Sequence, residues 1–169
     1  AIAPTGFENF IDTLLSGYKK IYLIKAPIGV SSERMLNLFM EGAVYRSLNV
    51  EGYYCPMKPS TKLEHLLIPE LRLAFITSNL YHTIDLSENP AEVEVINLDN
   101  IIRYDIIKYQ EPILEDSRIK MRELLEKSVY CLAQAKKEHD KLEQYYVPNM
   151  DFLKIDSLRL ELTQKFSQS

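Results

Sequence analysis

The chain has 169 residues, of which 46% are hydrophobic and 26% are charged, and this composition is typical of one folded domain with a hydrophobic core. Its formal net charge is -4 and its isoelectric point is near 5.5, and lysine and arginine are spread thinly along it. We therefore expect neither nucleic acid nor a membrane as a partner.

The cysteines and the hydrophobic runs indicate the compartment. Cys55 and Cys131 match no zinc or redox spacing, so we expect two free structural thiols in a cytoplasmic protein. No run approaches the roughly 18 apolar residues that a membrane helix needs, and the first residues lack the pattern of a signal peptide. Because the sequence begins at Ala1, we expect a piece of a longer chain.

The first fifty residues predict a helix, a strand and a second helix. Thr5 and Glu8 form a capping box, and the apolar spacing that follows predicts a helix ending at Gly17. Residues 20–25 (KIYLIK) predict a buried strand, which the residues APIG then break.

The second helix begins after this break. Ser31 or Ser32 caps it, and a wide apolar face continues to Leu48, with Asn49 ending the helix. We expect it to pack on a sheet as the first crossover of a right-handed βαβ unit.

The next segments complete an α/β core. Residues 50–55, 71–77 and 92–98 predict strands, and the alternating pattern of the last favours a half-exposed edge strand. Residues 61–67 predict a short helix or an extended turn. Strands that alternate with helices favour a layered α/β fold.

The last third of the chain predicts a long helix. Neither glycine nor proline occurs between Pro112 and Pro148, which permits about 35 helical residues, or about 50 Å. We expect residues 156–166 to form a final helix packed along it. The organisation is then one domain, with an α/β core at residues 1–104 and helices at 105–169 that pack back on the core. The long helix carries a heptad seam, formed by Leu114, Met121, Leu125, Ser128, Leu132, Ala135, His139, Leu142 and Tyr146.

The loop between the first strand and the second helix lies where a P-loop protein holds its nucleotide. A Walker A loop needs Gly, four spacers, Gly, Lys and Ser/Thr, and these places hold Ala26, Ser31, Ser32 and Glu33. None of the four matches. The missing lysine removes a charge-assisted contact, and Glu33 adds a negative charge where a phosphate would lie.

Backbone N–H groups at a helix start still attract anions, so the loop stays the candidate binding site. We predict no cofactor here, with ATP or phosphate as the alternative, and neither catalytic nor metal-binding residues. The candidate binding residues are Ile28, Gly29, Val30, Ser31, Ser32 and Glu33.

The three histidines give a weaker signal. His82 and Asp85 could form an acid–base pair, but without a nucleophile or a third ligand, local hydrogen bonding is the simpler interpretation for His82 and for His65. His139 is interpreted as a seam residue of the long helix. The motifs of serine hydrolases and zinc proteases are absent from the sequence.

Several segments together resemble the second half of a bacterial family of duplicated P-loop ATPase-like proteins. These are GFENFIDTL, KKIYLIKAPIG, YYC, LLIPELRLAFITS, Tyr81-His82 and AQAKKEHDKLEQYYVPNMDF. In that family the loop is a complete Walker A motif, whereas here only Gly29 keeps a family glycine. The family tends to place Asp at the end of the third strand, where this chain has Thr77.

The resemblance implies a three-layer P-loop NTPase-like fold with a small, mostly parallel sheet and a long C-terminal helical arm. It also implies a degenerate domain without ATP hydrolysis that acts as a structural or regulatory half of an ATPase-like protein. Two alternatives stay open: a nucleotide-binding ATPase or phosphotransferase-like protein with a remodelled loop, and a helical protein-interaction module. The expected partner is a second P-loop domain of the same chain, or a second copy bound through the long helix.

Overall fold

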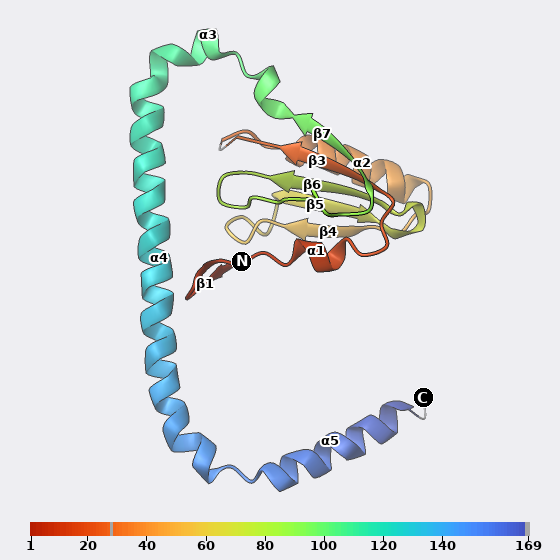
Figure 1. Ribbon diagram of the computed structural model, residues 1–169, viewed down its shortest axis with the longest axis vertical. Coiled ribbons are helices and arrows are strands. Elements are labelled where there is room, and N and C mark those ends of the chain that lie inside the picture. Colours follow the sequence, from red (N-terminus) through yellow and green to blue (C-terminus); the bar gives the residue numbers. More distant parts are fainter. Residues whose placement is uncertain (28, 168–169) are drawn as a thin grey trace.

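The computed structural model describes residues 1–27 and 29–167 and has a five-stranded mixed sheet at its centre (Figure 1). The strand order is β4-β5-β6-β3-β7, in which β3 pairs in parallel with β6 and β7, and β5 pairs in antiparallel with β4 and β6. The strands are β3 (Lys20–Lys25), β4 (Glu51–Tyr54), β5 (Leu63–Ile68), β6 (Leu73–Ser78) and β7 (Glu92–Asn97).

Helices and a small hairpin surround this sheet. A two-stranded hairpin, β1 (Ile2–Ala3) with β2 (Gly6–Phe7), begins the chain. The α-helices are α1 (Ile11–Leu14), α2 (Glu33–Tyr45), α3 (Tyr104–Ile107), α4 (Glu111–Tyr146) and α5 (Phe152–Ser167). Short 3₁₀ turns are η1 (Pro69–Leu71), η2 (Leu98–Ile101), η3 (Lys108–Gln110) and η4 (Val147–Asn149).

Side chains of the sheet alternate between two cores. On β3, Ile21 and Leu23 belong to one core and Ile24 to the other, as the two-residue period of a strand requires. The first core is closed by α1 and the segment after β6, and the second is closed by α2, whose Leu36 is fully buried. The side chains on both faces of the central strands are therefore buried.

The predicted three-layer P-loop fold with a mostly parallel sheet is wrong. Strand β5 lies antiparallel between β4 and β6, so the sheet is mixed. Among the described residues, the face opposite α2 carries the four-residue helix α1 and irregular chain in place of a helical layer. The α2 crossover leads from β3 to β4, which lies at the far edge of the sheet, with β5 and β6 between them.

Two local predictions are also wrong. Thr5 lies in the turn of the β1–β2 hairpin and caps no helix, although its hydroxyl does hydrogen bond to the Glu8 carboxylate at 2.6 Å. The first helix begins only at Ile11. Residues 61–67, expected as a short helix or turn, contain most of β5. In contrast, β3, α2, the edge position of β7 and the long helix α4 follow the sequence pattern.

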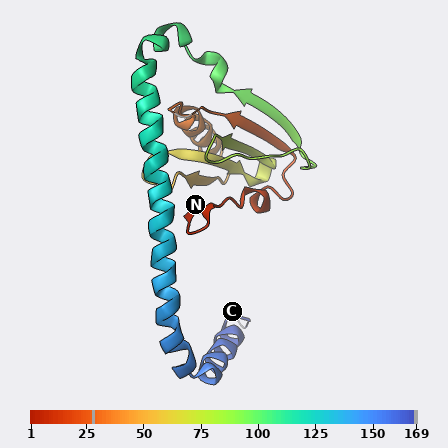
Figure 2. The ribbon, with the colours of Figure 1, turned by 60° about the vertical axis from the view of Figure 1, so that its left-hand side comes forward.

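Helices α4 and α5 form an arm beside the sheet (Figures 1 and 2). The expected seam of α4 meets the rest of the molecule only in its first half, where Leu125 is buried and Leu114 and Met121 are half-buried; from Ser128 onward its seam residues are exposed. Every described residue of α5 is exposed, so packing of this helix on the core is not observed. Among the described residues, no helix combines the length and apolar content required to cross a membrane.

Candidate functional site

A pocket of about 570 Å³ opens at the carboxyl ends of β3 and β6. This edge of the sheet faces α4 (Figure 1). In open sheets with parallel strands, the carboxyl edge is where ligands usually bind, because loops leave the strands there in different directions. The N-terminal hairpin and Met121 of α4 complete the wall. Polar groups on the wall come from Ser32, Lys62, Glu64, Thr77, Asn79 and His82.

The predicted loop residues lie in two different places on the surface. Gly29, Val30 and Ser32 line the pocket, and Gly29 has a φ of +90°, a conformation that glycine adopts without strain. Ser31 and Glu33 instead line a separate, shallow surface depression. Ile28 lies outside the described residues.

One amide at the start of α2 is already bound by the loop itself. The Ser31 hydroxyl accepts the Glu33 N–H at 3.1 Å, so this amide is not available to a phosphate. Ser32 occupies the N-cap position, but its hydroxyl makes no capping bond and lies 2.8 Å from the hydroxyl of Thr77. This buried hydroxyl pair joins the loop to the end of β6, at the positions where the Walker lysine and the strand-end acid were expected.

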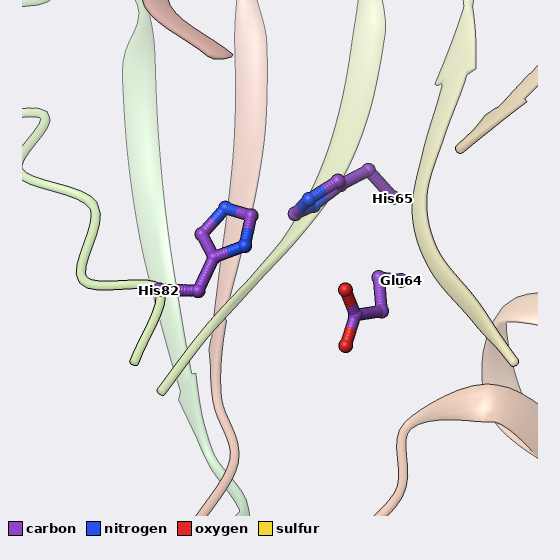
Figure 3. Close-up of side chains that lie close together, drawn as sticks. All are labelled: Glu64, His65 and His82. Atoms are coloured by element: carbon purple, nitrogen blue, oxygen red, sulfur yellow. The ribbon is translucent and has the colours of Figure 1, made fainter. Parts of the chain in front are cut away.

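Behind the loop, three side chains from two distant segments meet. Glu64 and His65 are the second and third residues of β5, and His82 follows β6. One ligand atom from each of the three lies within 4.8 Å of the others (Figure 3). The rings of His65 and His82 are 4.9 Å apart between centroids and tilted by 56°. Glu64 and His65 are buried, and His82 is half-buried.

A β-bulge explains how neighbours on one strand can both reach this cluster. In a regular strand Glu64 and His65 would point to opposite faces. The pairing of β4 with β5 shifts here: Tyr53 pairs with His65, and Tyr54 pairs with Leu63, so that Glu64 is the extra residue. Bulges commonly redirect a side chain beside a functional site.

His82 is placed by a tight turn. The Asn79 side chain accepts the N–H groups of Tyr81 and His82 at 3.0 and 3.1 Å, and Asn79 and His82 also exchange two backbone hydrogen bonds. After the turn, the Ser78 hydroxyl accepts the Ile84 N–H at 3.1 Å. The turn thus returns the chain over the end of β6 and brings His82 to His65.

The carboxylate of Glu64 is charged and paired. Burial alone would raise its pKa, but the Lys62 ammonium, 2.8 Å away, and the Cys55 thiol outweigh burial and lower the pKa. Lys62 directly precedes β5 and Glu64 is its second residue, and both side chains line the pocket. The pocket therefore holds a fixed negative charge with a nearby cation.

His65 is a neutral hydrogen-bond donor. Burial, reinforced by the neighbouring His82, lowers the pKa of His65 to about 4. Its Nδ1 accepts the Thr77 N–H at 3.2 Å, and a neutral imidazole that accepts at Nδ1 carries its proton on Nε2. The backbone of β6 thus fixes the tautomer of this ring.

His82 has an unsatisfied nitrogen. Burial lowers the pKa of His82, so that the ring is neutral at pH 7. Its Nε2 is buried and makes no hydrogen bond within the described residues. A buried polar atom without a partner is uncommon in folded proteins and indicates a place for a water, an ion or a ligand.

Only part of this site is predicted from the sequence. The possible pairing of His82 with Asp85 is not observed, because the Asp85 carboxylate instead accepts the Ser87 N–H at 2.9 Å. Glu64 was not considered, because only the bulge places it beside His65. His139 is exposed on α4, near Asp140 and Glu143.

Comparisons of the chain with protein-family models, curated proteins and solved structures found no match.

Proposed function

We propose that this chain is a non-hydrolysing domain that binds a small ligand in the pocket and acts as a structural or regulatory half of an ATPase-like protein. The Ser32–Thr77 hydroxyl pair carries the proposal. Phosphoryl transfer needs a cation on the transferred phosphate and an acid or amide that holds Mg²⁺. Here the loop and the strand end each offer a neutral hydroxyl, and the two satisfy one another.

The pocket supports the binding half of the proposal. Its wall combines apolar surface from Ala26, Val30 and Met121 with a few polar groups, which is the usual composition of a small-molecule site. The charged Glu64 close to the loop disfavours a polyphosphate. A ligand with at least one donor for Glu64 suits this wall better than ATP does.

The first test is Mg-dependent ATP turnover by the purified chain. We expect no turnover above background. Turnover that Gly29→Ala abolishes, while Lys136→Ala on the distant arm leaves it unchanged, would contradict the proposal.

A second test restores the missing residues. The triple variant Ser31→Gly, Ser32→Lys and Glu33→Ser recreates the later positions of a Walker A motif. If the loop backbone still suits a phosphate, calorimetry should show tighter ATP binding by the variant than by the wild type. Equal affinities would mean that this loop cannot be converted by side chains alone.

The arm favours a second candidate function, that of a helical interaction module. Large apolar side chains on α5 are exposed, and an isolated amphipathic helix gains most of its stability from a packed face. The partner would be a second domain of the same protein or a second copy. Those exposed on α5 are Phe152, Leu153, Ile155, Leu158, Leu160, Leu162 and Phe166.

Light scattering, which measures the mass of the particle in solution, tests whether the arm binds a second copy of the chain. If a second copy binds through the seam, Ala135→Leu should lower the measured mass, because a bulky side chain blocks close helix approach. Lys137→Ala serves as the control. A wild-type mass equal to that of one chain would leave only a different partner for the arm.

We also propose a cytoplasmic location. It is supported by Cys55 and Cys131, which are both free thiols, as is usual in a reducing compartment.

A further inference from the structure

We propose that Glu64, His65 and His82 form a binding site for a divalent first-row transition-metal ion, with Zn²⁺ as the ion to test. The site goes beyond the proposed function, which requires no metal. Two imidazoles and one carboxylate are the ligand set of open zinc sites, in which the fourth position belongs to water or substrate. Here that position would face the pocket, because Glu64 and His82 line it.

The distances suit a site that closes on the ion. The three ligand atoms lie within 4.8 Å of one another without an ion between them. Around Zn²⁺, with bonds of about 2.1 Å, tetrahedral ligand atoms are about 3.4 Å apart. The side chains must therefore approach by about 1.4 Å at most. Glu64 at a bulge and His82 after a turn are the two residues free of regular strand pairing, so they can make this movement.

The unsatisfied Nε2 of His82 is an independent observation at the same place. It is a buried atom of a neutral ring with no hydrogen bond among the described residues. A metal ion binds the lone pair of a neutral imidazole nitrogen, and Nε2 of His82 supplies one in the tautomer that carries its proton on Nδ1. Of the three groups, His82 is thus the one that loses no protein contact when it binds the ion.

The other two groups must each exchange a partner. Glu64 is held by Lys62, which competes with a cation for the carboxylate. His65 accepts the Thr77 N–H at Nδ1, so its proton is on Nε2, and ligation requires that this hydrogen bond be given up. We infer that His82 and Glu64 bind the ion first and that His65 completes the site.

This order predicts an unusual effect of Lys62. The Lys62→Met variant keeps most of the side-chain volume but removes the ammonium group, which competes with the metal ion for Glu64 and also repels it. Zinc affinity should then rise, by about two- to fivefold if the pair has the strength of an ordinary partly exposed ion pair. Non-specific zinc binding at surface carboxylates would not respond to this change.

The chain contains its own control site. His139, Asp140 and Glu143 also lie within 4.8 Å of one another, but all are on α4 and open to water, with Asp140 already paired to Lys136. Such exposed groups have neither a pocket nor an unsatisfied buried atom. His139→Ala therefore removes a histidine of equal chemistry without touching the proposed site.

The experiment titrates the chelator-treated full chain with Zn²⁺ by calorimetry and with Co²⁺ by visible absorption, without nucleotide. We expect one site per chain, with the intense Co²⁺ absorption of a tetrahedral centre. His82→Ala and Glu64→Gln should each weaken binding by about tenfold or more, since loss of a ligand exceeds loss of an outer partner. His139→Ala should bind as the wild type does, and urea unfolding identifies any variant that does not fold.

Three results would overturn the inference. They are an absence of zinc binding to the wild type, a loss caused by His139→Ala but not by His82→Ala, and a Lys62→Met variant that binds zinc more weakly than the wild type. Should His82→Ala fail to fold, Glu64→Gln and Lys62→Met still decide between the outcomes. ATP turnover tests the proposed function separately, so either idea can fail alone.

Discussion

The sheet and the helical arm contain similar apolar residues in opposite environments. All six residues of β5 are buried, whereas all described residues of α5 are exposed. In the sheet, two cores cover both faces of the central strands. In the arm, helix geometry is regular, but among the described residues the α4 seam is covered only in its first half, around Leu125, and α5 is exposed throughout. Regular secondary structure and a buried core are thus separate properties, and only the sheet has both.

Charges differ between the two regions in the same way. The arm carries ion pairs one helical turn apart, such as Lys136–Asp140 and Lys165–Glu161, whose side chains are about half to two-thirds exposed. The sheet instead places Glu64 in a buried position, with Lys62 beside it. Exposed pairs contribute little, while a buried carboxylate depends on its partner. The buried, charged Glu64 therefore makes the sheet the better candidate for a functional site than the arm.

The largest expected difference comes from truncating one leucine in each region. Leu66→Ala, in the α2 core, should lower the free energy of unfolding by about 2 to 5 kcal/mol, because Leu66 is fully buried. Leu158→Ala on α5 should change it by less than about 0.5 kcal/mol, as a surface substitution does. Urea unfolding of both variants measures the contrast. Equal losses would mean that α5 is packed in solution.

Acidification should destabilise the sheet next most strongly. The folded pKa of His65 is about 4, below the unfolded value of 6.5, so between these values the unfolded chain binds more protons. Stability is therefore complete above pH 6.5 and falls as the pH decreases, by about 2 kcal/mol between pH 7 and pH 5 for this group. His82, whose pKa is also lowered, acts in the same direction.

Urea midpoints across this range, in the presence of a chelator, test the pH dependence. His65→Gln should flatten the curve because it removes the titrating ring. A wild-type chain that becomes more stable on acidification would contradict the assignment of neutral buried histidines.

A smaller effect is expected where α2 joins the sheet. Ser32→Ala and Thr77→Val each remove one hydroxyl of the buried pair and leave the other unsatisfied. Each variant should lose about 1 to 2 kcal/mol of stability, and the double variant should lose less than the sum. The coupling energy in this double-mutant cycle, about 1 kcal/mol, is the quantity to measure. Full additivity would show that the two hydroxyls do not interact.

The smallest effect belongs to the arm. Lys136→Ala breaks an exposed pair 2.7 Å long and should leave the unfolding temperature close to that of the wild type. The difference should shrink further in 1 M salt, which screens exposed charges. Thermal unfolding at two salt concentrations measures it. A larger, salt-independent loss would place Lys136 in a buried contact.

The sequence predicted elements with strong local patterns and missed those that depend on distant pairing. Strand β3 and helix α4 are continuous in the expected residue types and lack interruptions. Strand β5 (LEHLLI) places two polar residues in a short apolar run after a loop, so its strand character comes from β4 and β6 on either side. The wrong topology follows from this single strand, because β5 makes the sheet mixed.

The candidate site was predictable only at its loop. Gly29 and Ser32 lie in a recognisable break between strand and helix, and both do line the pocket. Glu64 and His82 are distant in the sequence, and a bulge and a turn bring them together. A glutamate and a histidine side by side at the start of a strand were the available signal.

The position of Met121 has a thermodynamic consequence. This residue belongs to the 36-residue helix α4, yet it forms part of the pocket wall. If occupying the pocket changes the free energy of holding α4 against the sheet, then holding α4 must change the affinity for the occupant by the same factor. A partner that binds the outer half of α4 and changes how α4 lies against the sheet would then also change the affinity of the pocket for its occupant.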